Sequence, residues 1–286
     1  PPSGTSSSRL RQQARSARAD VDDVGANGIR APRRRVAMTA RSIAIVQARM
    51  GSTRLPGKVL LPLIGEPILG LVMRRSARAM TVHEVVVATT TLPEDDRVVE
   101  LAEANGWPVE RGSESDLLDR YLGAARAHDA QVIVRITADC PLIDPVVIDR
   151  VVEAFHASGV DYASNVISPR TYPRGLDVEV IRRDALERAG IEDRDPAWRE
   201  HVTPYIYRHP ERFELLRVPA DEDHSDQRWS VDTAEDYTLM TRIYAALGRD
   251  DASWEEALAV VEANPAWGNI NRDVVQRLVP SGGDGD

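Results

Sequence analysis

Short apolar runs alternate along this chain with stretches in which apolar residues recur every three or four positions. The short runs predict buried β-strands at 43–48, 84–89, 132–136 and near Val109. The periodic stretches predict helices over 67–80, 95–105, 116–128 and 145–157. Strands and helices that alternate in this order are typical of a mostly parallel sheet with helices on both faces. The first half therefore predicts a Rossmann-like α/β fold.

The pattern becomes less regular after Asp161. It still predicts strands over 176–181, 213–218 and 228–231, followed by helices over 234–247 and 254–262. No internal repeat is visible. We interpret residues 41–279 as one α/β domain whose second half is added to, or inserted into, the same sheet.

The two ends differ in composition from this domain. Residues 1–40 are rich in Ser and Arg, carry eight Arg against three Asp, and predict a disordered basic arm. Met38 stands just before the first predicted strand, so it is a candidate natural start; a contact of the arm with nucleic acid or an acidic partner is the alternative. Residues 280–286 predict a flexible tail.

Composition narrows the class of protein. The chain has 286 residues, 42% of them hydrophobic, which is enough for a full core. It has no apolar run of about 18 residues and no signal-peptide pattern, so we expect a cytoplasmic protein without a membrane span. The net charge is −9, which leaves −14 outside the arm and argues against nucleic acid as the main ligand. A single cysteine, Cys140, argues against disulfides and structural zinc.

The loop that follows the first strand is the strongest candidate site. It reads Gln47-Ala-Arg-Met-Gly-Ser-Thr-Arg-Leu-Pro-Gly-Lys58, and Lys58 is the only lysine in the chain. Backbone N–H groups in a Gly-Ser-Thr turn can bind phosphate oxygens, and three cations suit a triphosphate better than one phosphate. The candidate triphosphate ligands are Arg49, Gly51, Ser52, Thr53, Arg54 and Lys58. The Gly-Lys pair is followed by Val59 and the spacing differs, so this is not a Walker loop.

Two carboxylates at the ends of predicted strands are candidate metal ligands. Asp139 follows the strand over 132–136, and Asp232 follows the one predicted over 228–231. Ends of parallel strands meet at one edge of a sheet, and Mg²⁺ takes one or two carboxylates besides substrate phosphates and water. For Asp232, which precedes Thr233, a helix N-cap is the alternative.

These motifs together resemble the spore coat polysaccharide biosynthesis protein F family, which is similar to CMP-KDO synthetase and the acylneuraminate cytidylyltransferases. Besides the string 47–60, the resemblance rests on segments 111–114, 139–142, 174–179, 200–205 and 231–237, and it spans about 41–279. It implies a nucleotidyltransferase fold like that of type A glycosyltransferases, a homodimer, and the use of CTP and Mg²⁺.

The resemblance also assigns roles to residues. Arg49, Ser52, Arg54 and Lys58 match the triphosphate loop, and Asp139 and Asp232 match the metal carboxylates. The residues that fall where these enzymes hold the nucleoside are Thr89, Thr90, Arg111 and Ser113. In the sugar-acid synthetases the residues before the metal aspartate include Gln, whereas this chain has Thr137-Ala138, so the sugar is left open.

The candidate acceptor ligands are Arg174, Asp177, Glu179, Glu200 and His201. Asp177 and Glu179 alternate on a predicted strand, so both are expected on one face, either receiving acceptor hydroxyls or facing solvent. Glu200 and His201 are expected to open a helix, where a subunit contact is the alternative role for His201. Cys140 is expected to be a small buried residue beside the metal and not a nucleophile.

The predicted activity is transfer of CMP from CTP to a sugar or sugar acid, with release of pyrophosphate, for polysaccharide or glycoconjugate synthesis. Two alternatives remain open. A glycosyltransferase would use the Asp221-Glu222-Asp223 sequence to hold Mn²⁺, although these residues resemble a solvated acidic loop. An inactive nucleotide-binding subunit is the other, and the presence of Lys58 weighs against it.

Overall fold

The computed structural model describes residues 40–276. Except for Ala40, the predicted arm over 1–40 and the tail over 280–286 lie outside the described residues.

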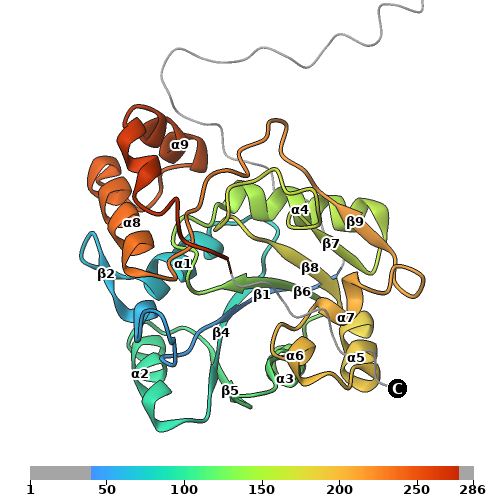
Figure 1. Cartoon of the computed structure of the whole chain (residues 1–286). Helices are drawn as coiled ribbons and strands as arrows, with labels where there is room; N and C mark the ends of the chain where they lie inside the picture. The colour runs from blue at the N-terminus through green and yellow to red at the C-terminus, as the bar shows by residue number, and fades with distance from the viewer. Residues whose placement is uncertain (1–39, 277–286) are drawn as a thin grey trace, which may run out of the picture. The chain divides into compact units, whose positions relative to one another are not determined.

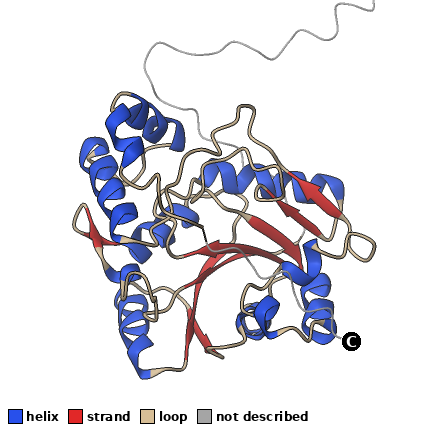
Figure 2. Ribbon diagram, viewed as in Figure 1, coloured by secondary structure: helices blue, strands red, loops and turns tan. Residues whose placement is uncertain are grey.

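A seven-stranded sheet forms the centre of the fold (Figures 1 and 2). Its strands in spatial order are β5 (Val109–Gly112), β4 (Glu84–Thr90), β1 (Ser42–Gln47), β6 (Val132–Thr137), β8 (Glu179–Arg182), β7 (Tyr162–Ser164) and β9 (Leu215–Arg217). Only β8 runs against its neighbours β6 and β7; every other pairing in this sheet is parallel. The predicted mostly parallel α/β sheet is thereby confirmed.

Helices cover both faces of the sheet, as predicted. The larger core contains residues of α1 (Ile68–Ala77), α2 (Asp96–Ala104), α4 (Pro145–Ser158), α8 (Ala234–Leu247) and α9 (Trp254–Glu262). The core on the opposite face contains residues of α3 (Leu117–Ala127), α5 (Arg183–Glu192), α6 (Pro196–Arg199) and α7 (Pro204–Tyr207). The hairpin β2 (Pro62–Leu63) and β3 (Glu66–Pro67) and the 3₁₀ turns Lys58–Leu60, Pro93–Asp95 and Pro265–Asn269 complete the fold.

Two of the predicted strands are wrong in part or in whole. The strand expected over 176–181 begins only at Glu179, because the Asn165 side chain takes the preceding backbone groups. Its Nδ2 donates to the Leu176 carbonyl at 2.6 Å, and its Oδ1 accepts from the Val178 N–H at 2.9 Å. Residues 228–231 form no strand, only an isolated bridge between Arg228 and Arg174.

The helix expected to open at Glu200 and His201 is also wrong. These two residues lie between α6 and α7, and α7 begins only at Pro204. Val202 has a φ of 71°, which a helix cannot contain, so the chain turns before it becomes helical again.

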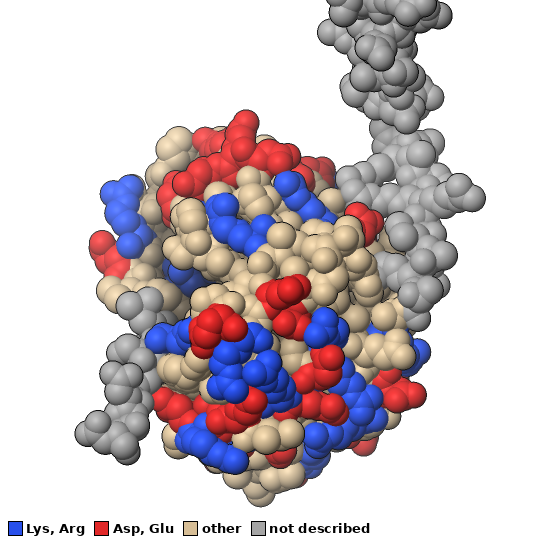
Figure 3. Space-filling view, turned by 90° about the vertical axis from the view of Figure 1, so that its right-hand side faces the viewer, with Lys and Arg blue, Asp and Glu red and all other residues tan. Residues whose placement is uncertain are grey.

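Figure 3 shows one face of the molecule, on which acidic side chains gather along the upper edge and acidic and basic side chains are interleaved over the lower half. Within residues 40–276, no helix combines the length and apolarity that a membrane crossing requires.

Candidate functional site

The loop after β1 is closed on itself around one residue. The carbonyl of Met50 accepts hydrogen bonds from the N–H of Ser52 at 2.8 Å and of Gly57 at 3.1 Å, and Gly57 has a φ of 69° that favours glycine. The expectation of a free Ser52 N–H is therefore wrong. The N–H groups of Gly51 and Thr53 have no hydrogen-bond partner within the described part of the chain, which suits a backbone cradle for an anion.

A buried carboxylate anchors this loop to β4. Asp95 is fully buried, and its Oδ1 accepts from the Met50 N–H at 2.6 Å. Its Oδ2 accepts from the Thr90 hydroxyl. Asp95 could not be predicted as a site residue from the sequence, since nothing in its local pattern distinguishes it from the acidic residues Glu94 and Asp96 beside it.

Lys58 joins the loop to both predicted metal carboxylates. Its Nζ donates to Asp139 Oδ2 at 2.7 Å and to Asp232 Oδ1 at 2.8 Å. Arg54 lies 3.2 Å from the same Asp232 oxygen. The expectation that the two carboxylates converge beside the loop is confirmed by these distances, although Asp232 does not end a strand.

The cluster is strongly coupled electrostatically. Burial raises the pKa of Asp139, but the charge and the hydrogen bond of Lys58 outweigh burial and lower that pKa to about 2. Burial lowers the pKa of Lys58, and the two carboxylates outweigh it and raise that pKa above its usual value. As a result, Lys58 and Asp139 are both charged at neutral pH.

A second ring of contacts holds Asp232 in place. Arg228 donates to Asp232 Oδ2 at 2.8 Å and to Asp236 Oδ1 at 2.9 Å. Asp236 is 1% exposed and accepts from the N–H groups of Asp232 at 3.0 Å and Thr233 at 3.1 Å. Thr233, not Asp232, is the N-cap of α8, so the alternative of Asp232 as a helix cap is excluded.

Arg228 and Asp236 were not among the site residues predicted from the sequence. A signal was available for Asp236, because Thr233 with an acidic residue three positions later is a capping-box pattern. The backbone of Asp139 is held by Val231, whose N–H donates to the Asp139 main-chain carbonyl at 2.8 Å.

The predicted nucleoside residues lie at the ends of β4 and β5. Thr89 is buried, and its hydroxyl has no partner among the described residues. Arg111 donates to the carbonyl of Thr90 at 2.8 Å and pairs with Asp96 at 2.7 Å. Ser113 accepts from the Asp116 N–H at 3.0 Å. Their role toward a nucleoside stays a prediction.

One predicted acceptor residue lies beside the loop. Glu200 is 3.6 Å from Arg49, and both side chains are solvent-accessible. His201 follows it, and burial together with the charge of Arg135 lowers its pKa below the usual value. Glu200 reaches the loop from the α6–α7 connection, which also covers the opposite core.

The remaining predicted acceptor residues are engaged within the protein. Asp177 lies before β8 and accepts from Arg170 at 2.6 and 3.0 Å. Glu179 is buried on β8 and accepts from Arg135 and, at 2.7 Å, from the Tyr162 hydroxyl. The sequence predicted Asp177 and Glu179 on one face of the same strand. This prediction is wrong, because only Glu179 lies on β8.

Arg174 occupies the bridge to Arg228. Its N–H donates to Gln227 and its carbonyl accepts from the Trp229 N–H at 2.7 Å. Burial, and then the nearby charge of Arg170, lowers the pKa of Arg174. Its role toward an acceptor stays a prediction.

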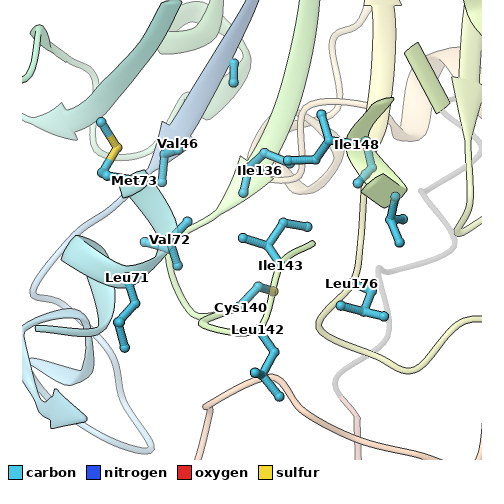
Figure 4. Packing of buried hydrophobic residues seen from close by; sticks show 14 of the residues in the cluster. Val46, Leu71, Val72, Met73, Ile136, Cys140, Leu142, Ile143, Ile148 and Leu176 are labelled. Carbon is cyan, nitrogen blue, oxygen red and sulfur yellow. The ribbon is translucent and has the colours of Figure 1, made fainter. Parts of the chain in front are cut away.

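Cys140 is buried, as expected. Figure 4 shows it in the turn that continues to Leu142 and Ile143, within the larger core. Burial, together with the negative charge of Asp139, raises the pKa of its thiol well above the usual value, so it is no nucleophile at neutral pH.

The donor set fits one divalent cation that a substrate helps to hold. The described residues contain no group of three or more His, Cys, Asp or Glu side chains able to bind a metal ion. Asp139 and Asp232 nevertheless direct oxygens at one cationic atom, and Mg²⁺ commonly uses one or two carboxylates together with substrate phosphates. Two carboxylates are enough for Mg²⁺ that also binds a substrate, but too few for a metal site built from protein ligands alone.

Comparisons with known sequences agree with this geometry. An uncharacterized protein of Methanocaldococcus jannaschii is 37% identical over 237 residues, which cover 82% of this chain and 96% of that protein. The spore coat polysaccharide biosynthesis protein SpsF of Bacillus subtilis is 34% identical, over 77% of this chain and 94% of its own length. The resemblance inferred from the motifs is confirmed.

Solved structures agree as well. A cytidylyltransferase from Leptospira borgpetersenii superposes with a TM-score of 0.77 at 35% identity, over 83% of this chain and all of that one. A CMP-KDO synthetase complexed with CTP, at 20% identity and a TM-score of 0.56 over 73% of this chain and 99% of its own, shares the fold. The family model for cytidylyltransferases matches residues 43–263, and with the loop and the paired carboxylates in place, this chain belongs to the cytidylyltransferase family.

Proposed function

We propose that this chain transfers CMP from CTP to a sugar or sugar acid with release of pyrophosphate, using Mg²⁺ bound to Asp139 and Asp232. The observation that carries the proposal is the contact of Lys58 with both carboxylates, since it joins the phosphate-type loop to a cation site. SpsF and the 3-deoxy-manno-octulosonate cytidylyltransferase of Geobacter metallireducens, the latter 42% identical over 38% of this chain and 42% of its own, support a sugar-type acceptor for polysaccharide or glycoconjugate synthesis.

In the reaction an acceptor hydroxyl gives its proton to water while its oxygen attacks the α-phosphorus of CTP and forms a new P–O bond. The bond from the α-phosphorus to the bridging oxygen breaks, and that oxygen leaves with pyrophosphate. Arg54 and Lys58 stabilise the negative charge that accumulates on pyrophosphate as it leaves. The N–H groups of Gly51 and Thr53 orient the triphosphate. Mg²⁺ supplies neutralisation of charge on the phosphate oxygens.

The acceptor is expected near Glu200 and His201, because Arg49 connects this segment to the loop. The resemblance that suggests the acceptor also implies a homodimer, which we include in the proposal together with the cytoplasmic location expected from the sequence. The glycosyltransferase alternative loses its support at Asp221, whose carboxylate is 88% exposed and paired with Arg150 on α4.

The first test is thermal unfolding with Mg²⁺ and, in turn, CTP, UTP, GTP and ATP. A ligand at 100 times its dissociation constant adds about 2.7 kcal/mol to stability, so CTP is expected to raise the midpoint most. Chelation of the metal with EDTA is expected to reduce the rise. A larger shift with another nucleotide would overturn the choice of base.

The second test is pyrophosphate release from CTP with a panel of sugars and sugar acids. Lys58→Ala is expected to reduce turnover on the order of 100-fold, because a preorganised charge at the leaving group is lost. Arg126→Ala, on the exposed end of α3, is the matched control that removes a cation elsewhere. Unchanged turnover in Lys58→Ala would contradict the assigned role, and no release with any acceptor would favour the inactive homologue.

A further inference from the structure

The inference concerns the place of the Lys58 ammonium between Asp139 and Asp232. The side chain is 12% exposed, and its Nζ donates to both carboxylates at 2.7 and 2.8 Å. The oxygens assigned to a divalent cation therefore already hold a monovalent cation that belongs to the chain itself.

The space between the carboxylates cannot hold both cations. Mg²⁺ binds oxygen at about 2.0–2.1 Å, which is closer than the contacts that Lys58 makes. An ion bound to Asp139 Oδ2 and Asp232 Oδ1 would lie where the ammonium now lies, and two cations at that position would repel each other. Metal binding by both oxygens thus requires Lys58 to leave.

Lys58 can leave, whereas Arg228, which also contacts Asp232, is held. Arg228 is fixed by hydrogen bonds to Asp236 at 2.9 Å and to Gln276 at 2.6 Å, and it uses the other oxygen of Asp232. Among residues 40–276, the Lys58 ammonium donates hydrogen bonds only to Asp139 and Asp232, and four flexible carbons connect it to the backbone. Its ammonium can move toward a triphosphate without a change in the fold.

We propose that Lys58 is an internal counter-ion that occupies the divalent-cation site of the empty enzyme and is drawn away by the triphosphate of the nucleotide. This inference rests on the proposed function for the divalent-cation site at Asp139 and Asp232 and for the nucleoside triphosphate as the ligand that displaces Lys58. The metal binds weakly to the enzyme alone, and binding of metal and nucleotide is coupled. The same contact prevents repulsion between Asp139 and Asp232 while the site is empty.

The experiment measures binding of Mn²⁺ alone, without nucleotide or acceptor, by the electron paramagnetic resonance signal of free Mn²⁺. Lys58→Gln is expected to bind Mn²⁺ at least about tenfold more tightly than the wild type, a difference of about 1.4 kcal/mol. Arg49→Gln is the matched control, because it removes one charge from the same loop but Arg49 pairs with Glu200 and neither carboxylate. It is expected to stay within about twofold of the wild type.

Two further variants decide where the ion binds and guard against misfolding. In Lys58→Gln combined with Asp139→Asn the gain in affinity is expected to disappear. Lys58→Met, which keeps the length of the side chain, replaces Lys58→Gln if that variant unfolds at a lower temperature than the assay allows.

Three results would overturn the inference: equal Mn²⁺ affinity in the wild type and the Lys58 variants, an equal gain in Arg49→Gln, or a gain that persists without Asp139. Because the assay contains neither CTP nor acceptor, its failure leaves the transferase assay unaffected. A failed transferase assay in turn leaves the Mn²⁺ result standing.

Discussion

Asp139 owes its ionised state at low pH mainly to Lys58. Its pKa is lowered from 3.8 to about 2, since the attraction of Lys58 outweighs the effect of burial. A carboxyl whose pKa is lower in the folded state stabilises the fold above its unfolded pKa, and that contribution is lost as pH falls through the folded pKa. The Asp139 contribution is therefore complete above about pH 4 and disappears toward pH 2.

Asp139→Asn is accordingly expected to be less stable than the wild type at pH 7 but to lose less stability between pH 4 and pH 2. Thermal unfolding followed by circular dichroism over this range measures the difference. Asp129→Asn is the control, because Asp129 is 95% exposed and 3.7 Å from its Arg183 partner. Parallel pH profiles for Asp139→Asn and the wild type would show that the ion pair does not contribute.

At the scale of elements, the crossing of segments 174–175 and 228–230 replaces a pair of strands. Gly175 has a φ of 106°, and a Cβ atom there would lie 2.7 Å from the carbonyl carbon of Trp229. Only glycine allows the two backbones to approach so closely. This crossing places Arg228 beside Asp232, so it also shapes the site.

Gly175→Ala is expected to cost on the order of 3 kcal/mol or more, because backbone strain and a clash with main-chain atoms add together. Gly248 also has a positive φ, 67°, but a Cβ atom there would meet open space. Gly248→Ala is therefore expected to cost about 1 kcal/mol. Denaturant unfolding of both variants makes the comparison. Equal losses would mean that the close approach to Trp229 is easily relaxed.

Helices α8 and α9 begin with the same capping motif in different surroundings. The motif joins Thr233 to Asp236 in α8 and Ser253 to Glu256 in α9. Asp236 is buried and pairs with Arg228, whereas Glu256 is 50% exposed and pairs with Arg249.

Asp236→Ala is expected to cost about 3–5 kcal/mol, because it takes the buried partner away from the Arg228 guanidinium, which is only 10% exposed. Glu256→Ala is expected to cost about 1 kcal/mol, as for an ordinary exposed cap. Chemical unfolding measures both, and a weaker Mg²⁺-dependent CTP shift in Asp236→Ala is expected, since Asp232 loses its support. Similar costs for the two variants would contradict the importance of burial.

The elements whose bounds were predicted well are those whose apolar periodicity and capping residues lie within the element itself. Helices α8 and α9 have the predicted bounds, because apolar spacing and capping residues are local. Segment 228–231 looked like a strand from its composition, but its partners lie far away in the sequence. Whether an apolar segment forms a strand or only a single bridge depends on contacts with other segments. Segment 176–178 is a second example, because the Asn165 side chain binds its backbone groups.

For the candidate site, the sequence identified Lys58, Asp139 and Asp232 through the motif and the expected edge of the sheet. It did not identify the residues that hold them. Asp95 and Arg228 act through contacts with Met50 and Asp232 that become visible only when separate segments meet. Charge that is buried and paired resembles surface charge until the fold is known.

At the scale of the whole molecule, the oligomeric state rests on the family resemblance. Light scattering of the purified chain is expected to give about twice the chain mass of 31.6 kDa. The large hydrophobic side chains that are well exposed among residues 40–276 are Ile64, Ile191 and Val275, so a contact between copies would use mixed surface, as in many transient interfaces. A monomeric mass at micromolar concentration would remove the dimer from the proposal.

The chain's only ε-amino group is the one enclosed by Asp139 and Asp232. Apart from the α-amino group, amine-directed acylating or carbamylating reagents therefore have a single lysine target, and the carboxylates keep it protonated and unreactive. The rate at which Lys58 is covalently labelled therefore measures how often this ion pair opens, without any engineered tag. Because the chain has a single lysine, ordinary amine modification reports on this one ion pair.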